Sequence, residues 1–321
     1  MPLNARIAPA QTVGQKACVI ALSTCWGDLV RLLVDHVLRV TCTRRVDSRS
    51  VKCSTTTRQA PPNPITAHHR QHIVMFNWFH KFGSPRWCYG ILGRLCLIAA
   101  LATGLLLVVG VVWGLAFAPV DYQQGHSYRI MFIHVPAAFL AQSIYLMMAG
   151  AAAVFLIWRM KLADLAVQCA APVGASITFL ALATGALWGM PTWGTFWEWD
   201  ARMTSTLVLF FLFVGMIALR SGLEYGPAAA RACAILAIVG AVNIPIIKYS
   251  VDWWYSLHQT SSITLTEKPS MPASMWMPLL IMVVAYYGFF FTVWMMRIRT
   301  EILHRERRTG WVRDLTDGAT Q

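Results

Sequence analysis

The uncharged run LCLIAALATGLLLVVGVVWGLAFA, from Leu95 to Ala118, decides the fold class of this chain. An apolar segment of about 20 residues is long enough to cross the ~30 Å hydrocarbon core of a bilayer as a helix. Hydrophobic residues make up 57% of the chain and charged residues only 13%, whereas roughly a quarter of the residues of an average soluble protein are charged. The sequence therefore indicates an integral membrane protein.

Five further uncharged, apolar runs follow along the chain. The fourth and fifth of the six runs are the shortest, so composition defines their ends least sharply. We expect an all-α membrane protein with six transmembrane helices. Their approximate bounds are Leu95–Ala118, Ile130–Trp158, Leu165–Trp188, Met203–Leu219, Ala232–Ile247 and Pro272–Met296.

Lysine and arginine predict which way these helices point, because short loops rich in these residues stay in the cytoplasm. Residues 75–94, 159–169, 220–231 and 297–321 together carry 13 Lys and Arg, whereas the loops on the opposite side carry four. We therefore expect both termini in the cytoplasm and the loop after the third span outside.

That outer loop belongs to the segment WGMPTWGTFWEWDARMTS, residues 188–205, which holds four tryptophans and a phenylalanine. Gly189, Pro191 and Gly194 interrupt it and break helical regularity, so we expect a shaped loop or a short interfacial helix. An aromatic shelf at a membrane surface suits a large flat ligand such as a porphyrin. The aromatic candidates for such a contact are Trp188, Trp193, Phe196, Trp197 and Trp199.

The alternative for these tryptophans is an aromatic belt at the level of the lipid headgroups. Eight of the 14 tryptophans fall at or near the expected outer face. A belt should mark both interfaces, so this asymmetry favours a ligand shelf.

Two histidines fall on the same expected side as the tryptophans. His134 lies at the outer mouth of the second span and His258 in the last outer loop. Imidazole is a strong axial ligand for haem iron, and two can hold the iron from opposite faces. Either histidine alone would be better explained by a hydrogen bond to a backbone carbonyl, but their coincidence with the shelf favours ligation. His126 is a weaker candidate in a polar loop.

Cations are scarce on the outer face, which makes Arg129 and Arg202 candidates for contacts with haem propionates. Two alternatives stay open: Arg202 pairs with Asp200 or Glu198, and Arg129 pairs with Asp121. We expect Asp200 to order the loop by accepting hydrogen bonds from indole N–H groups or from backbone amides at the start of the fourth span.

The first 74 residues differ from the rest, with ten Lys and Arg against three Asp and no apolar span. They are either a basic cytoplasmic arm that touches anionic lipid or, as we favour, sequence upstream of a true start at Met75. We thus divide the chain into a basic, disordered or mis-assigned extension, residues 1–74, and a six-helix membrane domain, residues 75–321.

Several kinds of chemistry lack their motifs in this sequence. The chain contains no C-x-x-C pair, the motif typical of thiol redox chemistry. It also contains no G-x-x-x-x-G-K-[ST] loop, the motif that binds a nucleotide phosphate. If ATP powers transport here, another subunit supplies it. We expect a binding and transfer protein rather than an enzyme, with membrane lipid but no nucleic acid among its partners.

Four separate sequence motifs together resemble those of a known protein family. Residues 188–205, together with APVDYQQG at 118–125, HVPAA at 134–138 and NIPIIKYSVDWWYSLHQ at 243–259, resemble the haem exporter protein C family of bacterial cytochrome c maturation, with its tryptophan-rich WWD signature. The resemblance covers about residues 78–315.

The resemblance implies a multi-pass protein of the bacterial inner membrane that presents haem b, as transient cargo, to a periplasmic haem chaperone. It implies work beside the ATP-binding and membrane subunits of an ABC-type complex and a small membrane subunit. In that family the histidines matching His134 and His258 are axial ligands, and the tryptophan-rich loop is the haem platform. Phe196 replaces the usual Trp and Glu198 a usual apolar residue; we expect Glu198 to face solvent or Arg202.

Three rival functions remain open from the sequence. A b-type membrane cytochrome would hold haem between histidines inside the spans, where this chain has none. A haem permease or pore subunit would line a path with intramembrane polar residues, which are few here. A haem-attaching synthetase of the same WWD superfamily would generally be longer, with additional helices or histidines.

Overall fold

The computed structural model describes residues 84–223, 226–254, 256–258 and 271–317. Six helical segments in this part are long and apolar enough to cross a membrane, so the prediction of a six-span all-α protein is confirmed. The prediction for residues 1–74 lies outside the described residues. The main elements are α3 (Pro85–Val112), η2 (Trp113–Phe117), η3 (Ser127–Ile130), α4 (Met131–Trp158), α5 (Lys161–Trp193), α6 (Ala201–Gly222), α7 (Pro227–Gly240), α8 (Asn243–Trp253) and α9 (Ala273–Arg305).

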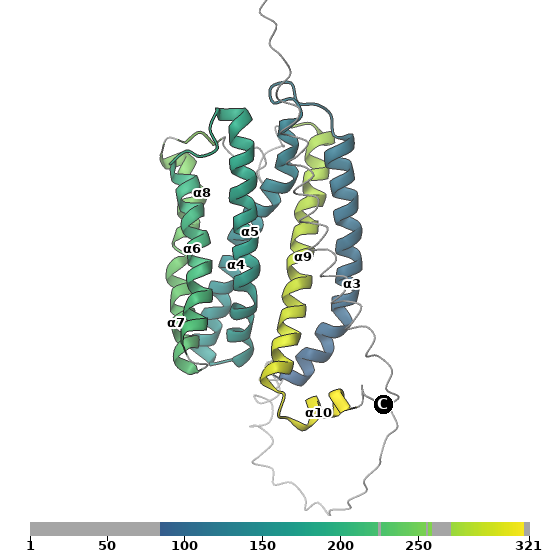
Figure 1. The fold of residues 1–321 in the computed structure, drawn as a ribbon, viewed down its shortest axis with the longest axis vertical. Helices are drawn as coiled ribbons and strands as arrows, with labels where there is room; N and C mark the ends of the chain where they lie inside the picture. The colour runs from purple at the N-terminus through teal and green to yellow at the C-terminus, as the bar shows by residue number, and fades with distance from the viewer. Residues whose placement is uncertain (1–83, 224–225, 255, 259–270, 318–321) are drawn as a thin grey trace, which may run out of the picture. The chain divides into compact units, whose positions relative to one another are not determined.

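The spans pack through close contacts between glycines and large side chains. α3 lies along α9, and α4 and α5 run together between this pair and the group formed by α6, α7 and α8 (Figure 1). The ring of Phe213 on α6 fills the space over Gly174 on α5, and Met282 on α9 covers Gly110 on α3. A Cβ atom at either glycine would collide with these side chains, so glycine lets the helices approach closely. A short helix, α10 (Gly310–Asp317), follows as part of a separate unit.

The fifth span consists of two helices, where the sequence pattern predicted one. α7 ends at Gly240 and α8 begins at Asn243. The hydroxyl of Tyr145 on α4 occupies the space over Gly240 and donates a hydrogen bond to the Leu236 carbonyl (3.1 Å). The side-chain amide of Asn243 donates a hydrogen bond to the backbone carbonyl of Ser205 on α6 (2.8 Å). The break is therefore held from both neighbouring helices, and it directs α8 toward the segment that carries His258.

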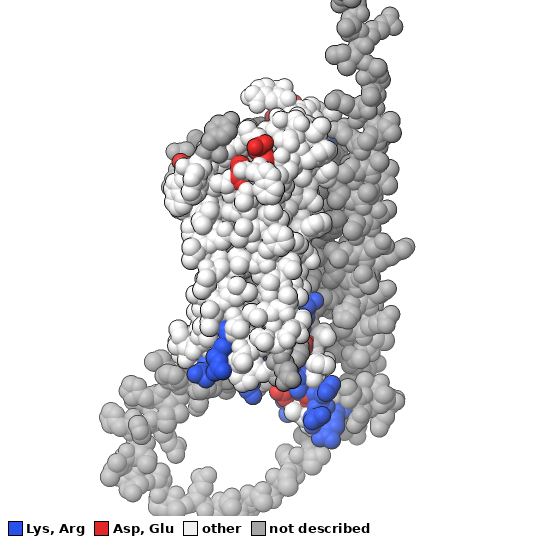
Figure 2. Space-filling model, turned by 60° about the vertical axis from the view of Figure 1, so that its left-hand side comes forward, with Lys and Arg blue, Asp and Glu red and all other residues white. Residues whose placement is uncertain are grey.

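Basic side chains gather at the lower end of the bundle (Figure 2). Asp164 at the start of α5 forms a bidentate ion pair with Arg220 at the end of α6, with both N–O distances at 2.9 Å. Arg305 at the end of α9 lies 3.3 Å from the same carboxylate. This cluster ties three spans together at the end of the bundle opposite the tryptophan-rich loop.

Candidate functional site

The tryptophan-rich segment, expected to be a shaped loop or a short interfacial helix, begins as the last turns of α5, which runs past the predicted end of the third span at Trp188. α5 continues through Gly189 and Pro191 to Trp193 and ends at Gly194, whose φ of +79° is the left-handed conformation that glycine adopts readily. Gly189 is required because a Cβ atom there would lie 2.9 Å from the Thr195 carbonyl oxygen. The loop thus folds back over the last turn of α5, and only the residues after Trp193 are irregular.

His134 on α4 is held against α5 by its Nδ1 atom. That atom lies 2.9 Å from the Ala181 carbonyl oxygen and 3.2 Å from the Thr184 hydroxyl. A carbonyl only accepts, so the proton is assigned to Nδ1 and the Nε2 atom keeps its lone pair. The imidazole packs over Gly185 and makes an edge contact with Trp188 at a centroid distance of 5.8 Å. His134 is therefore oriented by a polar partner while its second nitrogen stays available for a ligand.

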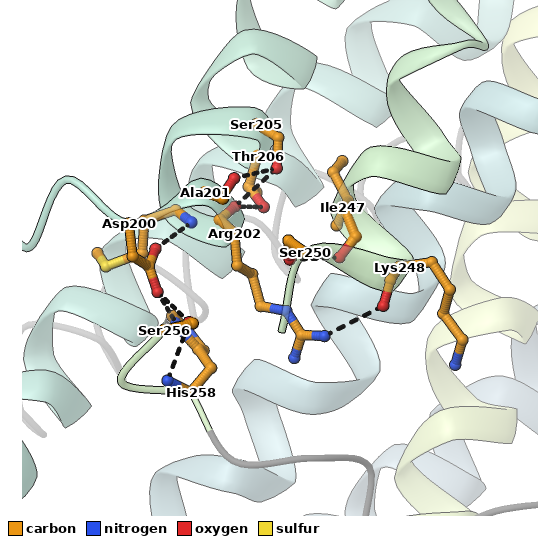
Figure 3. Close-up of polar contacts among 11 residues, drawn as sticks. Asp200, Ala201, Arg202, Ser205, Thr206, Ile247, Lys248, Ser250, Ser256 and His258 are labelled. Atoms are coloured by element: carbon orange, nitrogen blue, oxygen red, sulfur yellow. Dashed lines mark hydrogen bonds and ion pairs between the residues drawn. The ribbon is translucent and has the colours of Figure 1, made fainter. Parts of the chain in front are cut away.

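His258 is oriented in the same way by a carboxylate. Its Nδ1 atom lies 2.9 Å from Oδ2 of Asp200, and the Ser256 hydroxyl donates to the same oxygen (Figure 3). The other oxygen of Asp200 accepts the Met203 backbone N–H (2.7 Å) and caps α6. This confirms the prediction that Asp200 orders the start of the fourth span. The Trp193 ring contacts the imidazole of His258 at 4.8 Å between centroids.

The charge states of this pair follow from their surroundings. Burial lowers the pKa of His258 below its ordinary value, although the hydrogen bond to Asp200 opposes the shift. Burial acts to raise the pKa of Asp200, but hydrogen bonds from Ser256, the Met203 amide and His258 together bring it below its ordinary value. At neutral pH a neutral imidazole therefore donates to a charged carboxylate. Its Nε2 atom has no hydrogen-bond partner among the described residues.

Ser256, His258 and Asp200 are the residue types of a hydrolase triad, but their arrangement is different. In a triad the serine hydroxyl approaches Nε2 of the histidine while the carboxylate holds Nδ1. Here the Ser256 hydroxyl donates to the carboxylate on the Nδ1 side. The geometry does not activate this serine as a nucleophile, and it leaves Nε2 free for a ligand.

Aromatic side chains form an exposed surface in the segment that follows Trp193. Trp197 and Trp199 meet edge to face at 5.4 Å, and Trp199 and Phe196 are 73% and 54% exposed. The indole N–H of Trp197 is buried without a hydrogen-bond partner among the described residues, whereas Trp188 donates its own to Gln124 (2.8 Å). The segment therefore offers both aromatic faces and one unused donor.

Arg129 has a structural role that the sequence did not predict. Its two amino groups donate to the carbonyls of Leu115 and Ala118, each at 2.7 Å. They thus satisfy one carbonyl within η2 and one directly after it. Asp121 instead accepts the backbone N–H groups of its own turn, and the alternative of an ion pair between Arg129 and Asp121 is not found among the described residues. These bonds occupy Arg129, which weakens its candidacy for a propionate contact.

Arg202, in the first turn of α6, is held much less firmly. The only hydrogen bond of its side chain among the described residues is a long one, 3.4 Å, to the Lys248 carbonyl (Figure 3), and its Nε atom is buried without a partner there. No ion pair joins it to Asp200 or Glu198 in the described part of the chain, so the alternative of a pair with either acid is wrong. Glu198 is exposed, as expected.

The donor set of the described residues is of the kind that haem takes. Neither Nε2 atom has a hydrogen-bond partner among the described residues, an indole ring lies in a T-shaped contact with each imidazole, and buried donors of Arg202 and Trp197 without a partner suit a carboxylate. The sequence did not predict the residues that orient the two rings, because a backbone carbonyl or a hydroxyl has no distinctive sequence pattern. These residues are Ala181, Thr184, Gly185 and Ser256.

Comparison with known proteins gives one consistent answer. Residues 78–313 match the model of a family described as heme exporter protein C. The chain is 46% identical over 241 residues to heme exporter protein C of Haemophilus influenzae, covering 75% of this chain and 98% of that protein. It is also 46% identical over 241 residues to the Escherichia coli K12 protein of that name, covering 75% and 97%, and 49% identical over 210 residues to that of Bradyrhizobium diazoefficiens, covering 65% and 80%.

Proposed function

The chain belongs to the heme exporter protein C family, and on that premise we propose that it binds haem between His134 and His258 and hands it to a periplasmic haem chaperone. The main observation in support of this proposal is that both imidazoles use Nδ1 for a hydrogen bond, while neither Nε2 atom has a hydrogen-bond partner among the described residues. Haem supplies an iron with two axial positions, which neutral imidazoles fill well. The protein then acts in cytochrome c maturation as a carrier of haem rather than as an enzyme.

The aromatic surface supports transient rather than permanent binding. Stacking and apolar contact with Trp188, Trp193 and Trp197 provide affinity. The exposure of Trp199 and Phe196 leaves one side of the site open to a second protein. A partner can therefore compete for a ring edge or an axial position. Haem enclosed by the bundle, as in a b-type cytochrome, would not be accessible in this way.

Arg202 is our choice for a propionate contact. Its guanidinium lies at the same end as His258 and makes only one long hydrogen bond in the described part of the chain. A guanidinium binds a carboxylate in a bidentate manner, and the bond is stronger where water is partly excluded. We assign Arg129 a supporting role, since the carbonyls of Leu115 and Ala118 already hold it.

The basic residues at the opposite end orient the protein in the inner membrane. Short loops rich in lysine and arginine stay in the cytoplasm, which supports a periplasmic position for the histidines and the aromatic surface. The chain has no nucleotide-binding loop of the common kind. We therefore propose that it works with the ATP-binding and membrane subunits of an ABC-type complex and with a small membrane subunit, and that the haem is haem b.

The test is the absorption spectrum of the protein purified from haem-replete membranes. His134→Gly and His258→Gly should each lose the bis-imidazole spectrum, and added imidazole should restore it because it occupies the vacated position. The periplasmic chaperone, co-expressed with each variant, should remain without haem.

His126→Gly is the matched control. This histidine lies on the same side of the bundle but is exposed and makes no contact with either imidazole, so its removal should leave the spectrum intact. Full retention of the spectrum in both the His134 and His258 variants would exclude these residues as ligands and overturn the proposal.

A further inference from the structure

The two imidazoles differ in the acceptor that their Nδ1–H group meets. His134 donates to the neutral backbone carbonyl of Ala181 at 2.9 Å, with the Thr184 hydroxyl nearby. His258 donates to the carboxylate of Asp200, also at 2.9 Å. The distances are the same, so the difference lies in the charge of the acceptor.

A charged acceptor makes the stronger hydrogen bond and pulls the Nδ1 proton away from the ring. Electron density then rises at Nε2, and the imidazole becomes a better donor to a metal. The Asp200 side chain is only 4% exposed and that of His258 19%, so water screens this interaction little. From this arrangement we infer that Asp200 is a positioning residue that fixes the tautomer of His258 and makes it the stronger of the two axial ligands. The inference rests on the proposed function, because it takes both histidines as ligands.

Ser256 modulates this effect. Its hydroxyl donates to the same oxygen of Asp200 that accepts from His258. A second donor draws charge from the carboxylate and holds it in place. Removal of this hydroxyl should therefore strengthen the bond from His258 and shift the haem reduction potential in the direction opposite to removal of the carboxylate charge.

Asp200→Asn is the direct test, because asparagine caps helices about as well as aspartate. Its amide oxygen can keep the bond from the Met203 N–H while the charge opposite His258 is lost. The first readout uses the haem-free protein labelled with ¹⁵N-histidine. The wild type should show His258 protonated at Nδ1, and the variant should lose this fixed tautomer.

The second readout is haem itself. Asp200→Asn should weaken haem binding about 10-fold, the lower end of the effect of removing such a partner, and should move the reduction potential to a more positive value. Ser256→Ala should move the potential to a more negative value. Thr178→Val on α5 is the control, and it should change neither affinity nor potential because its hydroxyl donates to the Gly174 carbonyl of its own helix and orients neither imidazole.

The outcomes separate this inference from the proposed function. If His258→Gly loses its ligand but Asp200→Asn leaves tautomer, affinity and potential unchanged, Asp200 has no positioning role and the inference is overturned. If His258→Gly keeps the wild-type spectrum, the proposed function itself fails. If Asp200→Asn does not fold, the reduction potential of haem in Ser256→Ala tests the inference instead. A shift to a more negative potential supports the inference, and no shift or a shift to a more positive potential overturns it.

Discussion

Gly185 on α5 lies against the imidazole of His134 on α4, and a Cβ atom at Gly185 would lie 2.9 Å from Cε1 of that ring. Real Cβ atoms do not approach so closely, so any side chain at Gly185 must displace the imidazole. The orientation of His134 therefore depends on an absent side chain as well as on the hydrogen bond to Ala181.

Gly185→Ala should accordingly reduce haem occupancy by moving the imidazole of His134 away from its present position. The protein should still fold, because the ring can tilt without breaking α4. Haem content per protein and the spectrum at saturating haem measure the effect. Gly104→Ala is the control: nothing lies within 4 Å of its Cβ position, so it should leave haem content unchanged and stabilise α3 by up to about 1 kcal/mol.

The two arginines should give opposite phenotypes. Arg202→Gln should weaken haem binding with little loss of stability, because the side chain makes one long hydrogen bond in the described part of the chain. Haem dimethyl ester, which lacks charged propionates, is the sharpest probe. Wild-type protein should prefer haem over the ester, and the variant should lose this preference; an equal preference in both would rule out a propionate contact by Arg202.

Arg129→Gln should instead destabilise the fold, by about 2 kcal/mol. The guanidinium donates two charge-assisted bonds to carbonyls at 2.7 Å, and a lost bond to a charged group costs roughly 1.5–3 kcal/mol. Chemical or thermal unfolding in detergent measures this change. The preference for haem over its dimethyl ester should remain in the folded fraction.

The ion pair between Asp164 and Arg220 should matter for stability and not for haem. Their side chains are 10% and 11% exposed, and removing one partner of a buried pair typically costs about 3–5 kcal/mol. Asp164→Asn should therefore lower the melting temperature clearly while the haem spectrum stays unchanged. Glu301→Gln, which breaks a more exposed pair with Arg305 on one helix, should cost only about 0.3–0.5 kcal/mol.

Acid should destabilise the haem-free protein through His258. Burial lowers the pKa of this imidazole below its ordinary 6.5, so as the pH falls below that value the unfolded chain takes up a proton that the folded protein resists. Stability must then decrease with falling pH. Melting temperatures should fall less steeply below about pH 6.5 in His258→Gln than in the wild type. Parallel profiles of melting temperature against pH for the two proteins would contradict the assignment of this acid effect to His258.

The spans and the partners of the site differ in how far the sequence could predict them. Long uncharged runs indicate transmembrane helices because hydrocarbon penalises every unpaired polar group, and this prediction was confirmed. The end of α5 was predicted too early, because Gly189 and Pro191 are tolerated in its last turns. The break between α7 and α8 was missed because Tyr145, which holds it, comes from another helix.

The candidate site could be proposed from residue types, but the contacts within it could not be predicted. Scarcity and sidedness pointed to His134, His258 and the tryptophans. The bond between Asp200 and His258 joins residues 58 positions apart, and no local pattern encodes it. The acceptors of Arg129 are backbone carbonyls, which every residue has, so the sequence offered only a nearby acid or a propionate as alternatives.

Asp200 both caps α6 and accepts the hydrogen bond from His258. In the proposed function, these two roles link haem binding thermodynamically to local order at the start of α6. One oxygen holds the first turn of α6 through the Met203 N–H, and the other meets His258. Iron bound at Nε2 of His258 would make the imidazole Nδ1–H more acidic, and this would tighten its bond to the carboxylate and immobilise that side chain further. Linkage is reciprocal, so an occupied site should protect the Met203 amide from hydrogen exchange, and fraying of α6 should promote release of the cargo.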